Sequence, residues 1–212
     1  EHFNFNITLG RRKRVWGRQI AAKWADDVVV LTARDKALWQ AGLSLKASLS
    51  VIPNMAPPVW QTAYAQTSRL VLTAGRLTAQ KGYDLLLKAW AIIEADQRGA
   101  GWSLLIRGDG LERLMLLQQA ACLKRVTIAP ATPHLDDDSR QAALYVCSSR
   151  YEGLPMVLLE AASAGVPVVA FDCETGPAEV IVPEETGILV PPEDYIGLAE
   201  ALLALMEQNE KR

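Results

Sequence analysis

The sequence predicts an α/β fold built on a doubly wound parallel sheet. Short runs of β-branched and aliphatic residues alternate with amphipathic segments along most of the 212 residues. Such alternation is typical of βαβ units, in which each helix packs on a parallel sheet. In order along the chain, the runs expected to form strands are 28–32, 49–52, 70–74, 103–106, 126–128, 144–147, 166–171 and 187–190.

The segments between these runs carry the apolar stripes of helices. The two clearest stripes are Leu85, Leu86, Ala89, Ile92 and Ile93, and then Tyr195, Ala199, Leu202, Leu203 and Met206. Residues at this spacing fall on one helical face, so both stripes are expected to pack into the core.

A weakly patterned stretch containing Pro57 and Pro58 interrupts the alternation and predicts an interdomain linker at 53–67. Residues 1–52 offer two helices and two strands, which are too few to close a core, and are expected to be the tail of a preceding domain. Residues 68–212 carry about six strand and helix pairs and are expected to form a complete domain. Because the chain starts without a methionine, we interpret it as a piece of a longer polypeptide.

Bulk composition excludes several classes of protein. Half of the residues are hydrophobic, 22% are charged and the formal net charge is -2, which argues against a nucleic-acid binder and favours a small-molecule partner. Cys122, Cys147 and Cys173 match neither a zinc pattern nor a disulfide framework, and so favour a reducing, cytoplasmic location. No apolar stretch reaches the roughly 20 residues of a membrane-spanning helix.

The loops that follow the strands are where function is expected, because ligands of open α/β sheets bind beyond the carboxyl ends of the strands. After the expected strand 70–74, Gly75 allows a tight turn, and Arg76 and Lys81 place two cations before a helix that starts near Tyr83. This loop would suit a diphosphate. The alternative, that both cations are solvated surface charges, stays open.

A second loop, 148–155, precedes a segment of helix-forming composition that ends at Gly165. Pro155 suits the first helical turn, because its missing N–H would have no partner there. The backbone N–H groups of Gly153, Leu154 and Met156 are then free, and together with the helix dipole they form an anion site.

Two glutamates flank this anion site. Glu152 lies just before the helix and Glu160 about five residues into it, so the carboxylates are separated by roughly 7 to 8 Å along the axis. Both are expected to accept hydrogen bonds from sugar hydroxyls rather than to touch a diphosphate. Glu160 stands among leucines and alanines, where a carboxylate needs partners. An exposed Glu160 that binds nothing is the alternative.

Two further patterns carry weaker signals. Thr175 and Gly176 lie in a loop at 172–179 and are expected to help close the same pocket. The acidic run 136–138 resembles a metal-binding segment, but we expect it to cap a helix beginning near Ser139. No metal is therefore expected.

Five motifs follow one another in a specific order. They are Gly75-Arg76 with Lys81-Gly82, Glu152-Gly153-Leu154-Pro155 with Glu160, the segment 165–173, Gly176-Pro177-Ala178-Glu179, and the segment 186–192. Together they resemble the glycosyl transferases group 1, family four of the retaining glycosyltransferases, over nearly the whole chain. The resemblance implies a GT-B fold, two facing Rossmann-like domains, of which this chain is the C-terminal half that holds most of the nucleotide-sugar.

The resemblance also implies roles for individual residues. Arg76 and Lys81, in the loop that Gly75 begins, would contact the diphosphate. Glu160 would bind the ribose and Glu152 the transferred sugar. The backbone of Gly153, Leu154 and Pro155 would lie beside the sugar and the phosphates.

The implied reaction transfers a hexose from a nucleotide-sugar, taken as a UDP-sugar, to a glycan or lipid-linked glycan with retention of configuration. Negative charge develops on the leaving nucleoside diphosphate, and Arg76, Lys81 and the helix N-terminus would stabilise it. Glu152, Arg76 and Lys81 are the candidate catalytic residues, and no metal or cofactor is implied. Because the acceptor side of such an enzyme belongs to the first domain, this chain alone is expected to bind its donor weakly and to show no transfer.

Other interpretations stay open. A dinucleotide-dependent oxidoreductase is one, since Gly108-Asp109-Gly110 follows an expected strand, although Arg113 stands where the third glycine of that pattern belongs. A nucleotide-sugar epimerase or hydrolase and a non-catalytic binding module are the others.

A basic cluster near the N-terminus has two interpretations. Its members are Arg11, Arg12, Lys13, Arg14, Arg18 and Lys23, beside Trp16 and Trp24. Enzymes that extend lipid-linked glycans often use such surfaces against anionic membranes, which would place the protein peripherally at the inner face of the membrane. A solvated helix face is the alternative.

Overall fold

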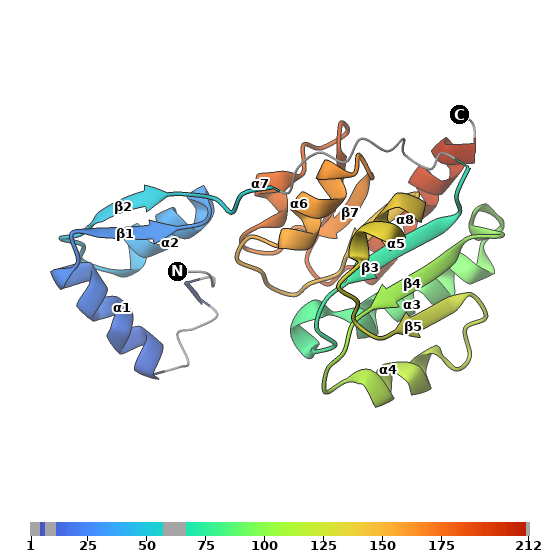
Figure 1. Ribbon diagram of the computed structural model, residues 1–212, viewed down its shortest axis with the longest axis horizontal. Coiled ribbons are helices and arrows are strands. Elements are labelled where there is room, and N and C mark those ends of the chain that lie inside the picture. Colours follow the sequence, from blue (N-terminus) through green and yellow to red (C-terminus); the bar gives the residue numbers. More distant parts are fainter. Residues whose placement is uncertain (1–4, 7–11, 57–66, 211–212) are drawn as a thin grey trace.

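The computed structural model describes residues 5–6, 12–56 and 67–210 and contains a six-stranded parallel sheet (Figure 1). The strands are β3 (Leu70–Ala74), β4 (Ser103–Arg107), β5 (Val126–Ala129), β6 (Leu144–Cys147), β7 (Val168–Phe171) and β8 (Gly187–Val190). Their spatial order is β5-β4-β3-β6-β7-β8, and every pair is parallel. The predicted fold class is confirmed.

The strand order places a switch point between β3 and β6. The chain builds the sheet outward from β3 to β5, returns to add β6 beside β3, and then continues outward on the other side. At such a point the loops after the two central strands diverge to opposite faces, which leaves room for a ligand at their carboxyl ends.

The expected limits of β3, β6 and β8 hold, and β4 and β5 each run one residue further than expected. The two N-terminal strands, Asp27–Val30 and Ser48–Val51, also differ slightly from the expected 28–32 and 49–52. β7 begins at Val168 rather than at 166. The carbonyl of Pro167 accepts a hydrogen bond from Tyr145 N–H, but proline has no N–H to continue the ladder.

Helices cover both faces of this sheet, because alternate strand residues point to opposite sides. On one face α3 (Tyr83–Ala95), α4 (Arg113–Ala120) and α8 (Tyr195–Glu210) pack in a cluster with Val71, and on the other α5 (Leu135–Gln141), α6 (Met156–Ser163) and α7 (Pro177–Val180) pack near Leu72. Both predicted stripes lie in the first cluster: Leu85, Leu86, Ala89, Ile93, Ala199, Leu202, Leu203 and Met206 are buried there, with Ile92 and Tyr195 partly buried.

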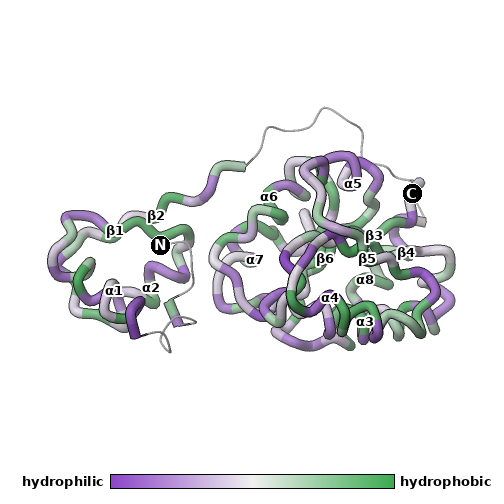
Figure 2. Tube along the Cα trace, turned by 60° about the horizontal axis from the view of Figure 1, so that its bottom comes forward, coloured by the Kyte–Doolittle hydropathy of each residue, from purple (hydrophilic) through white to green (hydrophobic). Residues whose placement is uncertain are grey.

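The N-terminal residues form a separate small unit. It contains α1 (Arg12–Trp24), β1 (Asp27–Val30), α2 (Ala33–Gly42) and β2 (Ser48–Val51), and its two strands pair in parallel. Phe5, Val28, Val30, Trp39 and Ala47 form its buried cluster. Figure 2 shows hydrophobic segments in both units.

The predicted linker falls between these units. Within the predicted range 53–67, residues 57–66 lie outside the described part of the chain, and the remainder belongs to no helix or strand. The predicted limits of the three segments, 1–52, 53–67 and 68–212, stay predictions. None of the described helices is both long enough and apolar enough to cross a bilayer. All three cysteines are free thiols, of which Cys147 and Cys173 are buried and Cys122 is exposed.

Candidate functional site

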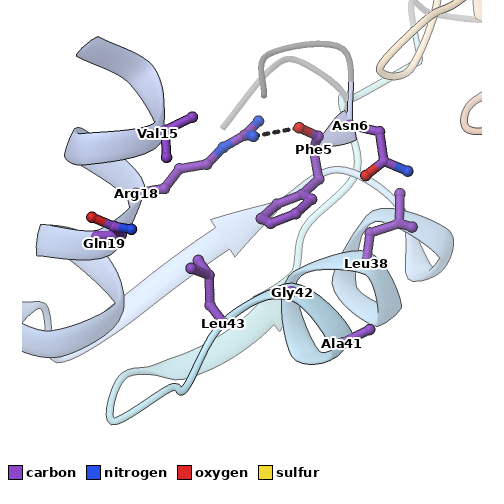
Figure 3. Close-up of a pocket in the computed structure, with 9 residues that line it drawn as sticks. All are labelled: Phe5, Asn6, Val15, Arg18, Gln19, Leu38, Ala41, Gly42 and Leu43. Atoms are coloured by element: carbon purple, nitrogen blue, oxygen red, sulfur yellow. Dashed lines mark hydrogen bonds between the residues drawn. The ribbon is translucent and has the colours of Figure 1, made fainter. Parts of the chain in front are cut away.

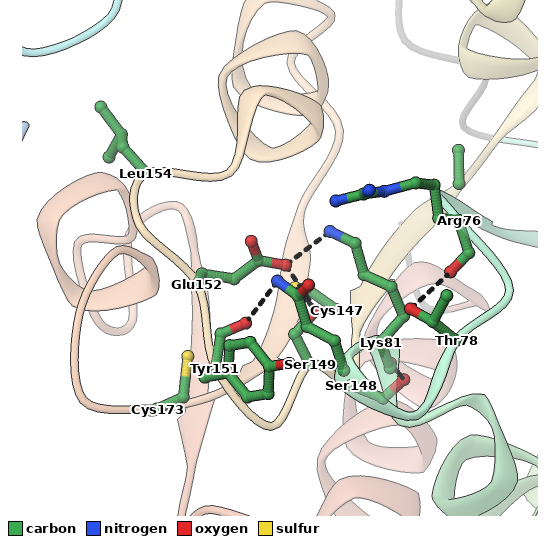
Figure 4. A network of polar contacts seen from close by, with 12 residues as sticks. Arg76, Thr78, Lys81, Cys147, Ser148, Ser149, Tyr151, Glu152, Leu154 and Cys173 are labelled. Atoms are coloured by element: carbon green, nitrogen blue, oxygen red, sulfur yellow. Dashed lines mark hydrogen bonds and ion pairs between the residues drawn. The ribbon is translucent and has the colours of Figure 1, made fainter. Parts of the chain in front are cut away.

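Two loops that are far apart in sequence meet at the switch point. One follows β3 and ends in a short 3-10 turn, η2 (Ala79–Lys81), and the other joins β6 to α6. Several hydrogen bonds join them, among them Ser148 Oγ to Lys81 O at 2.9 Å, Gln80 Nε2 to Tyr151 O at 3.0 Å, and Arg150 N to Gln80 O at 2.8 Å. The two loops that the sequence marks as candidate anion sites therefore form one site (Figure 4).

An ion pair between Lys81 and Glu152 lies at the centre of this site. Lys81 Nζ is 2.5 Å from Glu152 Oε1, and the two side chains are only 15% and 8% exposed. Ser149 Oγ donates to the same carboxylate oxygen at 2.6 Å. Oε2 accepts no hydrogen bond from the described residues, so it is available to a ligand hydroxyl. Separate roles were expected for the two residues, and their direct contact was missed.

Arg76 supplies the uncompensated charge of the site. Its side chain is exposed and pairs with no carboxylate among the described residues. Figure 4 shows it extending in the same direction as Lys81. Gly75 is needed just before it, because a Cβ at that position would lie 2.8 Å from Tyr83 Oη and 3.1 Å from Lys81 Cε.

The start of α6 faces the same site. Pro155 is the N-cap residue rather than part of the first helical turn, and the helix begins at Met156. The N–H groups of Gly153, Leu154 and Met156 donate to no described residue. This leaves a set of backbone donors at the positive end of the helix dipole, directly after Glu152 in the chain.

The loop after β7 contacts the backbone of Glu152. Thr175 is fully buried, and its Oγ1 donates to Glu152 O at 2.6 Å. A Cβ on Gly176 would approach Pro155 Cδ to 2.7 Å and Gly153 O to 2.8 Å. The expectation that Thr175 and Gly176 help to close the pocket stays a prediction. The Thr175 side chain itself is covered and holds the backbone of the neighbouring loop.

Glu160 is held very differently from Glu152. It is half-buried on α6, and its carboxylate accepts no hydrogen bond from the described residues. Burial raises the pKa of Glu160 above its usual value. A carboxylate in this position gains from a ligand that brings hydroxyl donors to it.

The remaining sequence patterns have structural roles. The acidic run does not cap a helix near Ser139, because α5 begins at Leu135 and places all three aspartates in its first turn. Asp138 pairs with Arg107 through contacts of 2.6 and 3.0 Å. In the parts of the chain described, no group of three or more His, Cys, Asp or Glu side chains is placed to hold a metal ion.

The Gly108-Asp109-Gly110 segment brings the loop after β4 against the loop after β3. A Cβ at Gly108 would lie 1.9 Å from Gly75 O, and one at Gly110 would lie 2.3 Å from Leu77 O. Asp109 accepts a hydrogen bond from Ala131 N–H at 2.9 Å. These glycines are accounted for by packing, which weakens the dinucleotide interpretation.

A pocket of about 400 Å³ lies in the N-terminal unit (Figure 3). Its one charged lining residue, Arg18, is 4% exposed, donates to Phe5 O at 2.5 Å and lies 4.7 Å above the Phe5 ring. The pocket thus offers mainly apolar walls, unlike the site at the switch point. Arg18 also does not belong to an exposed basic surface, contrary to expectation, and Arg11 of that cluster lies outside the described residues.

The N-terminal unit reaches the second domain at Arg34, a contact that the sequence did not indicate. Arg34 pairs with Asp172 at 2.8 Å, and its backbone N–H donates to Glu179 at 3.0 Å. Asn54 Nδ2 lies 3.5 Å from Leu154 O. Asp172 follows β7, Glu179 lies in α7, and Leu154 lies in the loop that also carries Glu152.

A doubly wound sheet with cations and a helix N-terminus at its switch point is typical of nucleotide-binding α/β domains. The chain belongs to the glycosyl transferases group 1 family, whose model matches residues 68–208. It is the C-terminal half of a GT-B fold.

Individual relatives agree with this assignment. An uncharacterized glycosyltransferase of Haemophilus influenzae is 31% identical over 214 residues, which cover 99% of this chain and 60% of that protein. The amylovoran biosynthesis glycosyltransferase AmsD of Erwinia amylovora is 37% identical over 167 residues, 74% of this chain and 46% of that protein. The crystal structure of a TarM variant from S. aureus in complex with UDP has a TM-score of 0.87 at 22% identity, covering 99% of this chain and 42% of TarM. The chain thus spans between 42% and 60% of the length of these relatives.

Proposed function

We propose that this chain is the donor-binding part of a retaining glycosyltransferase that transfers a hexose from a UDP-sugar to a glycan or lipid-linked glycan. The observation that carries the proposal is the Lys81–Glu152 pair with Arg76 near it, followed in the chain by the free N–H groups at the start of α6. It supports binding of a group that is anionic at one end and rich in hydroxyls at the other. The TarM structure, whose fold is similar, contains UDP, which supports the choice of base.

In the proposed reaction the bond from the sugar to the nucleoside diphosphate breaks, and negative charge grows on the leaving phosphate. Arg76, Lys81 and the α6 N–H groups stabilise that charge, and preorganised donors of this kind contribute most in such sites. The diphosphate competes with Glu152 for the ammonium group of Lys81. Glu152 then accepts hydrogen bonds from the sugar, and Glu160 accepts them from the ribose. Since these groups act by charge and hydrogen bonding, no side chain has to attack the sugar.

Calorimetric titration with UDP, GDP and ADP tests donor binding. We expect UDP to bind best, and Arg76→Ala and Glu160→Ala each to weaken UDP binding by about 1 kcal/mol or more, the contribution of one charge-assisted hydrogen bond. Arg98→Ala is the matched control, because Arg98 pairs with Asp96 and Glu200 on the surface. Unchanged UDP binding in both site variants would show that the site is elsewhere.

Product analysis separates transfer from the other reactions. With donor and acceptor present, the full-length protein is expected to form a new glycosidic bond with retained configuration. An epimerised donor or free sugar would instead support an epimerase or a hydrolase. A melting temperature raised by NAD would favour the oxidoreductase.

We also propose that the exposed face of α1 binds the anionic lipid surface on the inner side of the membrane. Trp16 and Trp24 are 67% and 82% exposed, and Ile20 lies between them on the same helical stripe. Lys13 and Lys23 are exposed close by. Exposed aromatic and basic side chains on one helix are typical of interfacial binding.

Vesicle sedimentation tests this contact. We expect the full-length protein to pellet with phosphatidylglycerol vesicles and not with phosphatidylcholine vesicles, and the double change Trp16→Ser and Trp24→Ser to abolish pelleting. Leu111→Ser is the control, because it removes an exposed apolar side chain elsewhere on the protein. A buried tryptophan such as Trp90 would be a poor control, since replacing it would disturb the core. Equal pelleting of the tryptophan variant and the wild type rules out the proposed surface.

A further inference from the structure

Arg150 joins three segments around the candidate site. Its guanidinium group donates to Ala79 O at 2.7 Å and makes paired contacts of 2.9 and 2.8 Å with the carboxylate of Asp84. A longer contact of 3.3 Å reaches a third partner, Glu193, beyond β8. The Arg150 side chain is 26% exposed, so these contacts are partly shielded from water.

The contacts of Arg150 fix both ends of the turn that carries Lys81. Ala79 is the first residue of η2 and Lys81 is its last, while Asp84 lies in the first turn of α3, just beyond Gly82. The turn is therefore bound at its start and just beyond its end by a single side chain. Since Lys81 has a flexible stem, the position of its ammonium group depends on how firmly this turn is held.

Arg150 also adjoins the other half of the ion pair. Its chain neighbour Ser149 donates to Glu152 Oε1, the oxygen that Lys81 contacts. The backbone N–H of Arg150 donates to Gln80 O within η2. Ser149 and Arg150 together thus set the spacing between the loop that carries Lys81 and the loop that carries Glu152.

We propose that Arg150 is a positioning residue that aims Lys81 at the leaving diphosphate. The proposal rests on the donor site proposed above and adds a residue to it. Arg150 acts through the planar geometry of its guanidinium group. Two parallel N–H groups donate to the two carboxylate oxygens of Asp84, while a third N–H donates to Ala79 O. A lysine keeps the charge but cannot make these contacts at once. The Arg150 contact lowers the pKa of Asp84, in keeping with a well-formed pair.

The test compares Arg150→Lys with Arg107→Lys. Arg107 makes the same kind of paired contact, to Asp138, with similar exposure, but among the described residues its side chain bonds to neither η2 nor α3. We expect Arg150→Lys to weaken UDP binding about tenfold, as for loss of one charge-assisted contact, and to leave uridine binding unchanged. Arg107→Lys should leave both affinities as in the wild type. Equal weakening of UDP and uridine by Arg150→Lys would indicate general loosening and overturn the proposal.

A second measurement needs no nucleotide. Trace labelling of lysines with acetic anhydride, read by mass spectrometry, reports how closely the Lys81 amine is held by its partners. We expect Lys81 to be acetylated faster in folded Arg150→Lys than in the wild type or in Arg107→Lys. Unchanged labelling of Lys81 would overturn the role of Arg150. If the wild type fails to bind UDP, the proposed function fails, and the labelling result still decides whether Arg150 positions Lys81.

Discussion

Replacing Lys81 with methionine is expected to abolish UDP binding and to lower the free energy of unfolding by about 3 kcal/mol. The side chain of Glu152 is only 8% exposed, and the ammonium group of Lys81 lies 2.5 Å from its Oε1. Methionine removes that charge while Ser149 remains as a neutral donor to the same oxygen. A buried carboxylate that loses its counter-charge bears the cost of its own desolvation, and the diphosphate loses its central cation.

Urea unfolding of Lys81→Met, Glu152→Gln and the double variant measures this cost. The double variant should be more stable than Lys81→Met alone, because the neutral amide removes the unpaired charge. It should still fail to bind UDP. If Lys81→Met unfolds at the same urea concentration as the wild type, the pair is too well hydrated to matter for stability. Retained UDP binding in that variant would exclude Lys81 from the site.

Much of the fold could be predicted from the sequence, because apolar runs and turn residues are local signals. The limits of β3, β6 and β8 agree with the predicted ones. The predicted start of β7 at 166 is wrong. The aliphatic run includes Val166 and Pro167, but the strand begins at Val168 because proline has no N–H for the hydrogen-bond ladder. The spatial order of the strands is not contained in any local pattern.

The site was predicted in pieces, and the way they fit together was not. The loops of Lys81 and Glu152 were both identified as anion sites from glycines, cations and a helix start, but their ion pair depends on β6 returning beside β3. Thr175 and Arg150 were missed in their structural roles because each acts on a segment remote in sequence. No periodicity or spacing marks such a contact, since only the closed fold brings the partners together.

Replacing Gly82 with alanine is expected to disrupt both the fold and the candidate site. Gly82 has φ of 62° and links η2 to α3. A Cβ there would lie 2.1 Å from the backbone oxygen of Ser148, a contact that only a shift of the chain can relieve. Ser148 Oγ donates to Lys81 O, so this shift would separate the two loops that the hydrogen bond joins. We expect a loss of about 3 kcal/mol or more in unfolding free energy, together with loss of UDP binding.

Gly165 provides a control that separates the cost of a left-handed backbone conformation from the cost of a steric clash. Its φ of 70° is close to that of Gly82, but a Cβ there meets nothing within 4 Å. Gly165→Ala therefore carries only the left-handed backbone cost of about 1 kcal/mol, measured by the same urea unfolding. A similar loss in both variants would mean that the approach of Gly82 to Ser148 relaxes easily. A clearly larger loss for Gly82→Ala, with UDP binding kept in Gly165→Ala, would show that the two loops must touch at backbone distance for Lys81 to reach its place.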